Sequence, residues 1–166
     1  YTRAVDAGVI RWLRIPDLGR TSSGMTTTPV TAPSQTPGAN AARLEYRVFL
    51  FDSGAVKVNA YLSPTLNFSG SRDGLRYAVS FDDQTPQVIN VQSDTSTRTW
   101  EKHVADNIIT STTQHSLARS GEHTLKFWAV DAGVVLQKIV IEARPIGATY
   151  LGPPECFHRE AVEPKA

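Results

Sequence analysis

The side chains in this sequence that could do acid–base or metal chemistry are four histidines, one cysteine and two adjacent aspartates. They are His103, His115, His123, His158, Cys156, Asp82 and Asp83. No two histidines have the His-x-x-x-His spacing, and a single cysteine can form neither a Cys-x-x-Cys pair nor an internal disulfide. The sequence therefore does not predict a zinc site. Each histidine is interpreted as solvated or held by structural hydrogen bonds.

The adjacent aspartates at 82 and 83 admit two interpretations. They could supply half of a carboxylate pair for acid–base catalysis, or they could form a turn in which Asp side chains bond the backbone. We favour the turn, because the pair directly follows an alternating apolar segment and leads to Pro86. Ser-x-x-Lys, Gly-x-Ser-x-Gly and phosphate-loop motifs are absent from the sequence. We therefore assign no catalytic residue and expect that this chain is not an enzyme.

Aromatic and amide side chains offer a different chemistry, which is the binding of a sugar. The candidate ligand-binding residues are Trp12, Tyr61, Asn67 and Trp128. Each of the three aromatics shares a predicted strand face with basic or amide side chains. The C–H face of a sugar ring can pack on such an aromatic platform while neighbouring polar groups bind its hydroxyls. In the alternative interpretation these rings support the helix, a loop or another domain.

The elements that must position these residues are eight or nine short strands and one helix. Alternating apolar and polar residues predict strands over 9–15, 43–51, 55–62, 74–82, 88–91, 108–117, 123–130 and 134–143. Asp-x-Gly loops at 52–54 and 131–133 predict hairpins over 43–62 and 123–143, and a third hairpin is predicted over 74–91. The segment 108–117 is dense in Thr and Ser, which favours a strand at a sheet edge.

Two other segments complete the pattern. Trp100, Val104 and Ile108 recur at intervals of four, which predicts an amphipathic helix over 97–107 with Thr97 as its N-cap and Trp100 in the core. Residues 21–41 are rich in Thr, Ser, Pro, Gly and Ala, and are predicted to form a long surface loop that has room for one short strand at 25–30. The alternative for this loop is the rim of a binding site.

Together these elements predict an all-β fold, an antiparallel β-sandwich with one short helix. Crossover helices for a parallel sheet are missing. We assign residues 1–154 to the sandwich and 155–166 to a charged, frayed tail. With 17 basic against 16 acidic side chains in 166 residues, we expect no nucleic-acid partner. No apolar run approaches the roughly 20 residues that cross a bilayer, so we expect no membrane partner either.

Seven ordered segments give the sequence a family resemblance. They are IPDLGRT (15–21), AYLSPTLNF (60–68), GLRYAVSFDD (74–83), VADNI (104–108), GEHTLKFWAVD (121–131), GVVLQKIVI (133–141) and YLGPP (150–154). In these segments the chain resembles the C-terminal domain of glycoside hydrolase family 115, a family of xylan alpha-1,2-glucuronidases. The resemblance implies a jelly-roll sandwich of the galactose-binding-like type, similar to carbohydrate-binding modules, with the catalytic machinery in preceding domains.

The resemblance also implies a function and a setting. The leading hypothesis is a non-catalytic accessory module that binds xylan or glucuronoxylan. Its partners would be that polysaccharide and the preceding catalytic domains of a secreted or periplasmic bacterial enzyme that degrades plant cell walls. The alternative is a structural or dimerisation domain that binds no sugar.

Two departures from the family pattern accompany the resemblance. Ala132 stands where a proline is expected, a change that loosens the turn. In related sandwiches an acidic opening strand supplies structural calcium ligands, and this chain starts after that position. We therefore expect no cofactor, with a structural calcium ion as the alternative.

Overall fold

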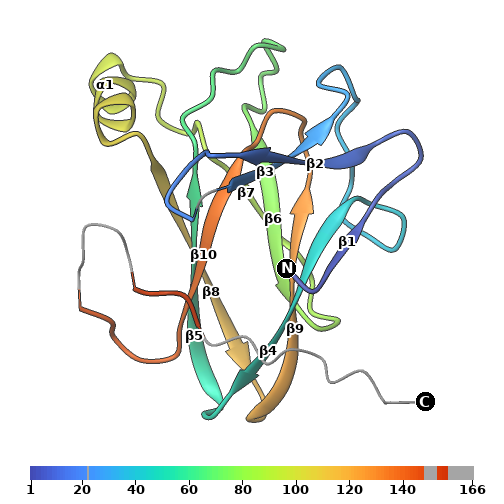
Figure 1. The fold of residues 1–166 in the computed structure, drawn as a ribbon, viewed down its shortest axis with the longest axis vertical. Coiled ribbons are helices and arrows are strands. Elements are labelled where there is room, and N and C mark those ends of the chain that lie inside the picture. The colour runs from blue at the N-terminus through green and yellow to red at the C-terminus, as the bar shows by residue number, and fades with distance from the viewer. Residues whose placement is uncertain (22, 148–152, 157–166) are drawn as a thin grey trace.

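The alternating segments form two antiparallel five-stranded sheets that face each other (Figure 1). The computed structural model describes residues 1–21, 23–147 and 153–156. One sheet has the order β1-β4-β9-β6-β7 and the other β2-β3-β10-β5-β8. The strands are β1 (Arg3–Val5), β2 (Arg11–Pro16), β3 (Ser23–Thr28), β4 (Arg43–Leu50), β5 (Gly54–Leu62), β6 (Arg76–Phe81), β7 (Gln87–Asn90), β8 (Ile109–Leu117), β9 (Gly121–Ala129) and β10 (Leu136–Glu142). The predicted β-sandwich is confirmed.

Two of the three predicted hairpins are wrong, because their arms lie in different sheets. Strand β4 pairs with β9 (Leu44 opposite Phe127), whereas β5 pairs with β10 (Ala60 opposite Ile139). The hairpins predicted over 43–62 and 123–143 are therefore connections between the sheets. Only the β6–β7 hairpin is confirmed. The edge position predicted for 108–117 is also confirmed, since β8 ends its sheet.

The core fills the space between the sheets with the apolar faces that the alternation predicts. Its largest fully buried side chains include Tyr77, Phe81, Phe127, Leu44 and Leu125. Tyr77 and Phe127 stack with their ring centroids 5.0 Å apart. Each fully buried apolar side chain of this size stabilises the fold by about 1.5–3 kcal/mol relative to exposure. The sandwich is thus a rigid support for the loops at its two ends.

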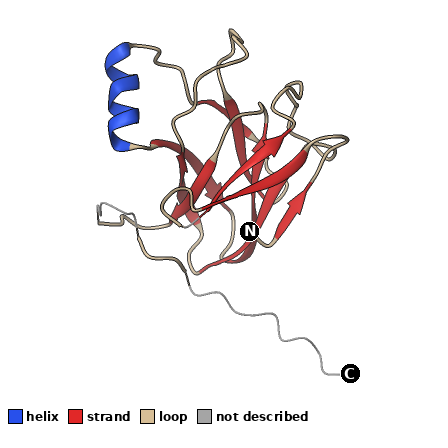
Figure 2. Cartoon of the chain, turned by 45° about the horizontal axis from the view of Figure 1, so that its top comes forward, coloured by secondary structure: helices blue, strands red, loops and turns tan. Residues whose placement is uncertain are grey.

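The helix α1 (Thr97–Asp106) lies outside the sandwich at one end (Figure 2). Its N-cap is Ser96, whose side chain accepts the backbone N–H of Thr99, and not Thr97 as predicted. No residue of the helix is buried, so the expected core position of Trp100 is wrong. The predicted tail (155–166) lies outside the described residues except for 155 and 156, as do residues 150–152 of the YLGPP segment.

A buried histidine in the core should make stability depend on pH. The Nδ1 atom of His115 lies 3.3 Å from Gln87 Nε2, and its Nε2 lies 2.8 Å from Thr113 Oγ1. Burial lowers the pKa of His115 below its ordinary value of 6.5. The unfolded chain therefore binds a proton at a higher pH than the folded one. This contribution to stability is present above pH 6.5 and is lost as the pH falls through the folded pKa.

We expect the melting temperature to fall less steeply with acid in the His115→Gln variant than in the unchanged protein. Thermal unfolding between about pH 8 and about pH 5 measures the difference. The His103→Gln variant is the control, because it makes the same substitution on the outlying helix, where no residue is buried. Parallel curves for the unchanged protein and His115→Gln would contradict the prediction.

Candidate functional site

Trp128, predicted to stand on a polar face, is buried on the outer side of its sheet. Its ring is 5% exposed and packs against Ala41, Ala78 and Val130. The indole N–H donates to Ser80 Oγ at 2.9 Å, and the Arg43 guanidinium lies 5.2 Å from the ring centroid. The expected exposure of Trp128 is therefore wrong, and the ring offers no open face to a sugar.

The cover over Trp128 is the end of the loop that was predicted to be a solvated connection. Gln35 fastens it to the sheet: its backbone N–H donates to Val130 O, its Nε2 donates to Ala129 O, and its Oε1 accepts the N–H of Ala42. A long polar loop can thus bury a tryptophan when one glutamine satisfies the backbone groups beneath it.

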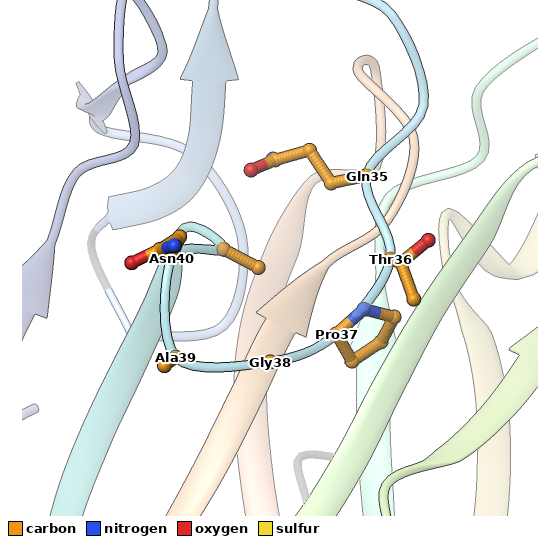
Figure 3. A pocket seen from close by; sticks show the side chains of 7 residues that line it. Gln35, Thr36, Pro37, Gly38, Ala39 and Asn40 are labelled. Atoms are coloured by element: carbon orange, nitrogen blue, oxygen red, sulfur yellow. The ribbon is translucent and has the colours of Figure 1, made fainter.

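The same loop encloses a shallow hollow of about 440 Å³. Figure 3 shows the Gln35 side chain pointing into the space that the loop surrounds. The lining residues are Gln35, Thr36, Pro37, Gly38, Ala39, Asn40 and Ala41. This lining has neither an aromatic ring nor a charge, so it offers no platform on which a sugar ring can stack.

Trp12 faces the interior of the sandwich. Its half-buried ring lies 6.4 Å from the Phe127 ring, and its indole N–H donates to Val5 O at 3.1 Å. The sequence predicted that Trp12 lies on the solvent-facing side of β2. This prediction is wrong, because that side of β2 packs against the other sheet.

Tyr61 lies on the outer face of its sheet, as predicted, and is half-buried. It stands opposite Lys138 and Thr110 on the neighbouring strands. On the same face Asn59 Nδ2 donates to Glu142 Oε1 at 2.6 Å, and Asn59 Oδ1 accepts the Thr112 hydroxyl at 2.6 Å. Tyr61 is thus the one sequence candidate with both an outward ring and ordered polar neighbours.

Asn67 organises the loop between β5 and β6. Its Nδ2 donates to Ser71 O at 2.6 Å, and its Oδ1 accepts the backbone N–H of Ser71 and the hydroxyl of Ser69. With both ends of its amide engaged, Asn67 fixes the loop. Among the described residues, its side-chain hydrogen bonds stay within this loop and reach none of Trp12, Tyr61 and Trp128.

The side chain that this loop presents is Phe68, which sequence reasoning missed. Phe68 is 54% exposed and lies against the backbone at Gly133. Position 133 has a φ of 92°, which favours glycine, and a Cβ atom there would come within 2.5 Å of the Phe68 ring and displace it. Phe68 follows Asn67 in a segment without strand periodicity, so alternation could not have revealed it. The ring is held on one side and open to solvent on the other.

A second hollow lies at the opposite end of the sandwich and has a volume of about 290 Å³. Its lining residues are Arg47, Asp82, Arg119, Glu122, His123 and Thr124. Asp82, at a positive φ of 46°, accepts the backbone N–H of Thr124 at 2.8 Å and lies 2.7 Å from His123 Nδ1. Asp82 and Asp83 lie in the turn after β6, and the Asp82 side chain bonds the backbone as the turn interpretation expects. Burial opposes ionisation, but these hydrogen bonds prevail and lower the pKa of Asp82.

In the part of the chain that the structure describes, no group of three or more His, Cys, Asp or Glu side chains is placed to hold a metal ion. Among the same residues no helix has the length and apolar character to span a membrane.

Solved structures with a similar fold come from carbohydrate-active proteins. A family 115 4-O-methyl-alpha-glucuronidase with specificity for decorated arabinogalactans has a TM-score of 0.65 and 20% identity, over 87% of this chain and 18% of that one. A family 35 carbohydrate-binding module from Clostridium thermocellum has a TM-score of 0.54 and 14% identity, over 84% and 92%. An exo-beta-1,3-galactanase from Phanerochaete chrysosporium has a TM-score of 0.51 and 14% identity, over 83% and 27%. No curated protein sequence matches the chain.

These likenesses define the chain as a β-sandwich domain with the fold of carbohydrate-binding modules. Residues 1–155 match the glycosyl hydrolase family 115 C-terminal domain, and the chain belongs to that family. The catalytic site of family 115 lies elsewhere, so this chain is a non-catalytic accessory domain. It spans 18% of the family 115 glucuronidase structure that it matches.

Proposed function

We propose that this domain binds xylan or glucuronoxylan as the accessory module of a xylan alpha-1,2-glucuronidase. In this proposal the parent enzyme is secreted or periplasmic, acts on plant cell walls, and carries its catalytic domains before this one. The observation that carries the proposal is the open ring of Phe68, which stands on an ordered loop at one end of a sandwich. The proposal includes no cofactor.

The geometry around Phe68 suits a sugar ring better than it suits a reaction. An exposed aromatic ring stacks on the C–H face of a pyranose, and its fixed position reduces the entropy lost on binding. Leu66 is exposed in the same loop and extends the apolar surface. Tyr61, on the outer face of β5, is a second and separate ring that we include in the proposal.

Replacing Phe68 with alanine should reduce the affinity for a xylo-oligosaccharide by roughly 10-fold, as expected when one aromatic contact is lost. Isothermal titration calorimetry measures the affinity, and the melting temperature should change little because the ring is half in solvent. Val88→Ala is the control, since Val88 is similarly exposed on the edge strand β7. Equal affinities of Phe68→Ala and the unchanged protein would exclude Phe68 as the platform.

The second candidate function is a structural or dimerisation domain, and the helix favours it. Trp100 is half-buried and Val104 is 52% exposed, although they form the apolar stripe of α1. Such a stripe is normally covered by a neighbouring surface. A molecular mass that rises with protein concentration in sedimentation, together with no heat on adding xylan, would favour this function over sugar binding.

A further inference from the structure

His123 is a buried histidine that takes no part in the proposed sugar binding. Its side chain is 2% exposed, although it stands beside the hollow of about 290 Å³. The ring belongs to β9 and meets the Phe81 ring edge to face, with centroids 6.3 Å apart. A buried polar side chain needs hydrogen-bond partners, so the partners of this ring decide which of its protonation states the fold accommodates.

Both ring nitrogens of His123 face oxygen atoms that only accept hydrogen bonds. Nδ1 lies 2.7 Å from a carboxylate oxygen of Asp82, and Nε2 lies 3.1 Å from the backbone carbonyl oxygen of Arg119. A neutral imidazole has one N–H donor, whereas the imidazolium ion has two. Rotating the ring by half a turn would point C–H groups at both oxygens. The two hydrogen bonds are therefore complete only when the ring carries its second proton.

The two bonds join the connection between β8 and β9 to the turn after β6. Residues 118–120 cross from one sheet to the other (Figure 1), and within the described part of the chain they form no backbone–backbone hydrogen bond. The Arg119 guanidinium donates to Ser120 O and Glu122 O, but both of these bonds are exposed. Asp82 is fixed separately, because it also accepts the backbone N–H of Thr124. The bond from Nε2 to Arg119 O is thus the one that a shift of the connection breaks.

Charged groups of both signs surround the ring, but only Asp82 bonds it among the described side chains. The others near the hollow are Asp83 in the turn after β6, Glu122 and Lys126 on β9, Arg47 on β4, and the Arg119 side chain, while His115 on β8 contacts the same Phe81 ring. Burial opposes the ionisation of Asp82, but its hydrogen bonds lower its pKa below the ordinary value of 3.8. Asp82 therefore stays an acceptor over the pH range in which histidines titrate.

We propose that His123, Asp82 and Arg119 form a pH-sensitive latch on the β8–β9 connection. In acid the doubly protonated ring donates to both oxygens and holds the connection against the sandwich. When the ring loses a proton at higher pH, Nδ1 keeps its bond, because the Asp82 carboxylate is the stronger acceptor. Nε2 then presents a lone pair to Arg119 O. Two acceptors in contact repel each other, so residues 118–120 move away and this wall of the hollow opens. The latch does not depend on sugar binding.

Nuclear magnetic resonance on the isotope-labelled 166-residue chain tests the latch between about pH 5 and about pH 8. We expect both ring nitrogens of His123 to carry a proton at the acid end, and Nε2 to lose its proton before Nδ1 as the pH rises. Over the same range the hydrogen-exchange protection of the amides of residues 118–122 should fall by roughly 10-fold, as when one hydrogen bond is lost. These measurements need no substitution.

His123→Gln removes the ring and should give residues 118–122 the same low protection at every pH. His115→Gln is the matched control, because it replaces the other histidine that contacts Phe81, and it should keep the pH dependence. Protection that stays constant with pH in the unchanged protein would overturn the latch. An unaltered pH dependence in His123→Gln, or loss of the Nδ1 proton first, would overturn it too. If His123→Gln does not fold, the measurements on the unchanged protein decide.

Discussion

Replacing Asp131 with alanine is expected to lower the free energy of unfolding by about 3–5 kcal/mol, as when one partner of a buried ion pair is removed. Asp131 Oδ2 accepts from Arg76 Nε at 2.8 Å and from the backbone N–H of Arg76 at 2.8 Å. The Asp131 side chain is 9% exposed and that of Arg76 is 24% exposed. The variant would leave the Arg76 guanidinium group with only the exposed Asp73 as an ionic partner, at the point where the chain passes from β9 in one sheet to β10 in the other. Chemical denaturation measures the change.

Asp73→Ala is the matched control for this prediction. Asp73 pairs with the same guanidinium group at 3.2 Å, but its side chain is 67% exposed. An exposed ion pair contributes about 1 kcal/mol or less, so this variant should stay close to the unchanged protein. Equal losses in the two variants would show that burial of Asp131 does not set the strength of the pair.

The pKa of Asp131 gives the same prediction a pH dependence. Burial alone would raise this pKa, but the hydrogen bonds from Arg76 and Ser34 lower it below the ordinary value of 3.8. A carboxyl group with a lowered pKa in the folded state adds stability above its unfolded pKa and loses that contribution as the pH falls. The destabilisation caused by Asp131→Ala should therefore shrink in acid, below about pH 4.

Alternation in the sequence predicted the core-facing side chains of β4, β5 and β6, although not those of β2, and it could not predict which strands are neighbours. Leu44 and Val58 lie on facing sheets, yet both point inward. The two arms of a hairpin show the same alternation of apolar and polar residues as two strands of facing sheets, since every one of these strands has one apolar face. The choice between them depends on pairings such as Leu44 with Phe127, between residues far apart in the sequence.

The candidate site was predicted less well, because exposure depends on what covers a face. Trp128 alternates with polar residues, but the loop held by Gln35 closes over it. The rule that selected Trp128 applies equally to Phe49 and Phe51, which alternate with the inward Val48 and Leu50 and remain open to solvent. Phe68 gives no such signal, since the loop that presents it has no strand period.

Substitutions of Trp128 provide the sharpest test of whether the two tryptophans proposed from the sequence, Trp12 and Trp128, bind sugar or support the fold. Because its ring is buried and its N–H is bonded to Ser80, we expect Trp128→Ala to lower the free energy of unfolding by about 3–5 kcal/mol. Trp128→Phe keeps an aromatic ring but leaves Ser80 Oγ without its donor, so it should cost about 1–3 kcal/mol.

Denaturation and calorimetry on the same samples separate the two roles of Trp128. A structural tryptophan makes the alanine variant less stable than the phenylalanine variant, while oligosaccharide affinity of the folded fraction is unchanged in both. A binding tryptophan gives the reverse result, with affinity lost and stability kept. That outcome would require the loop around Gln35 to open in solution, because only an opened loop exposes the Trp128 ring.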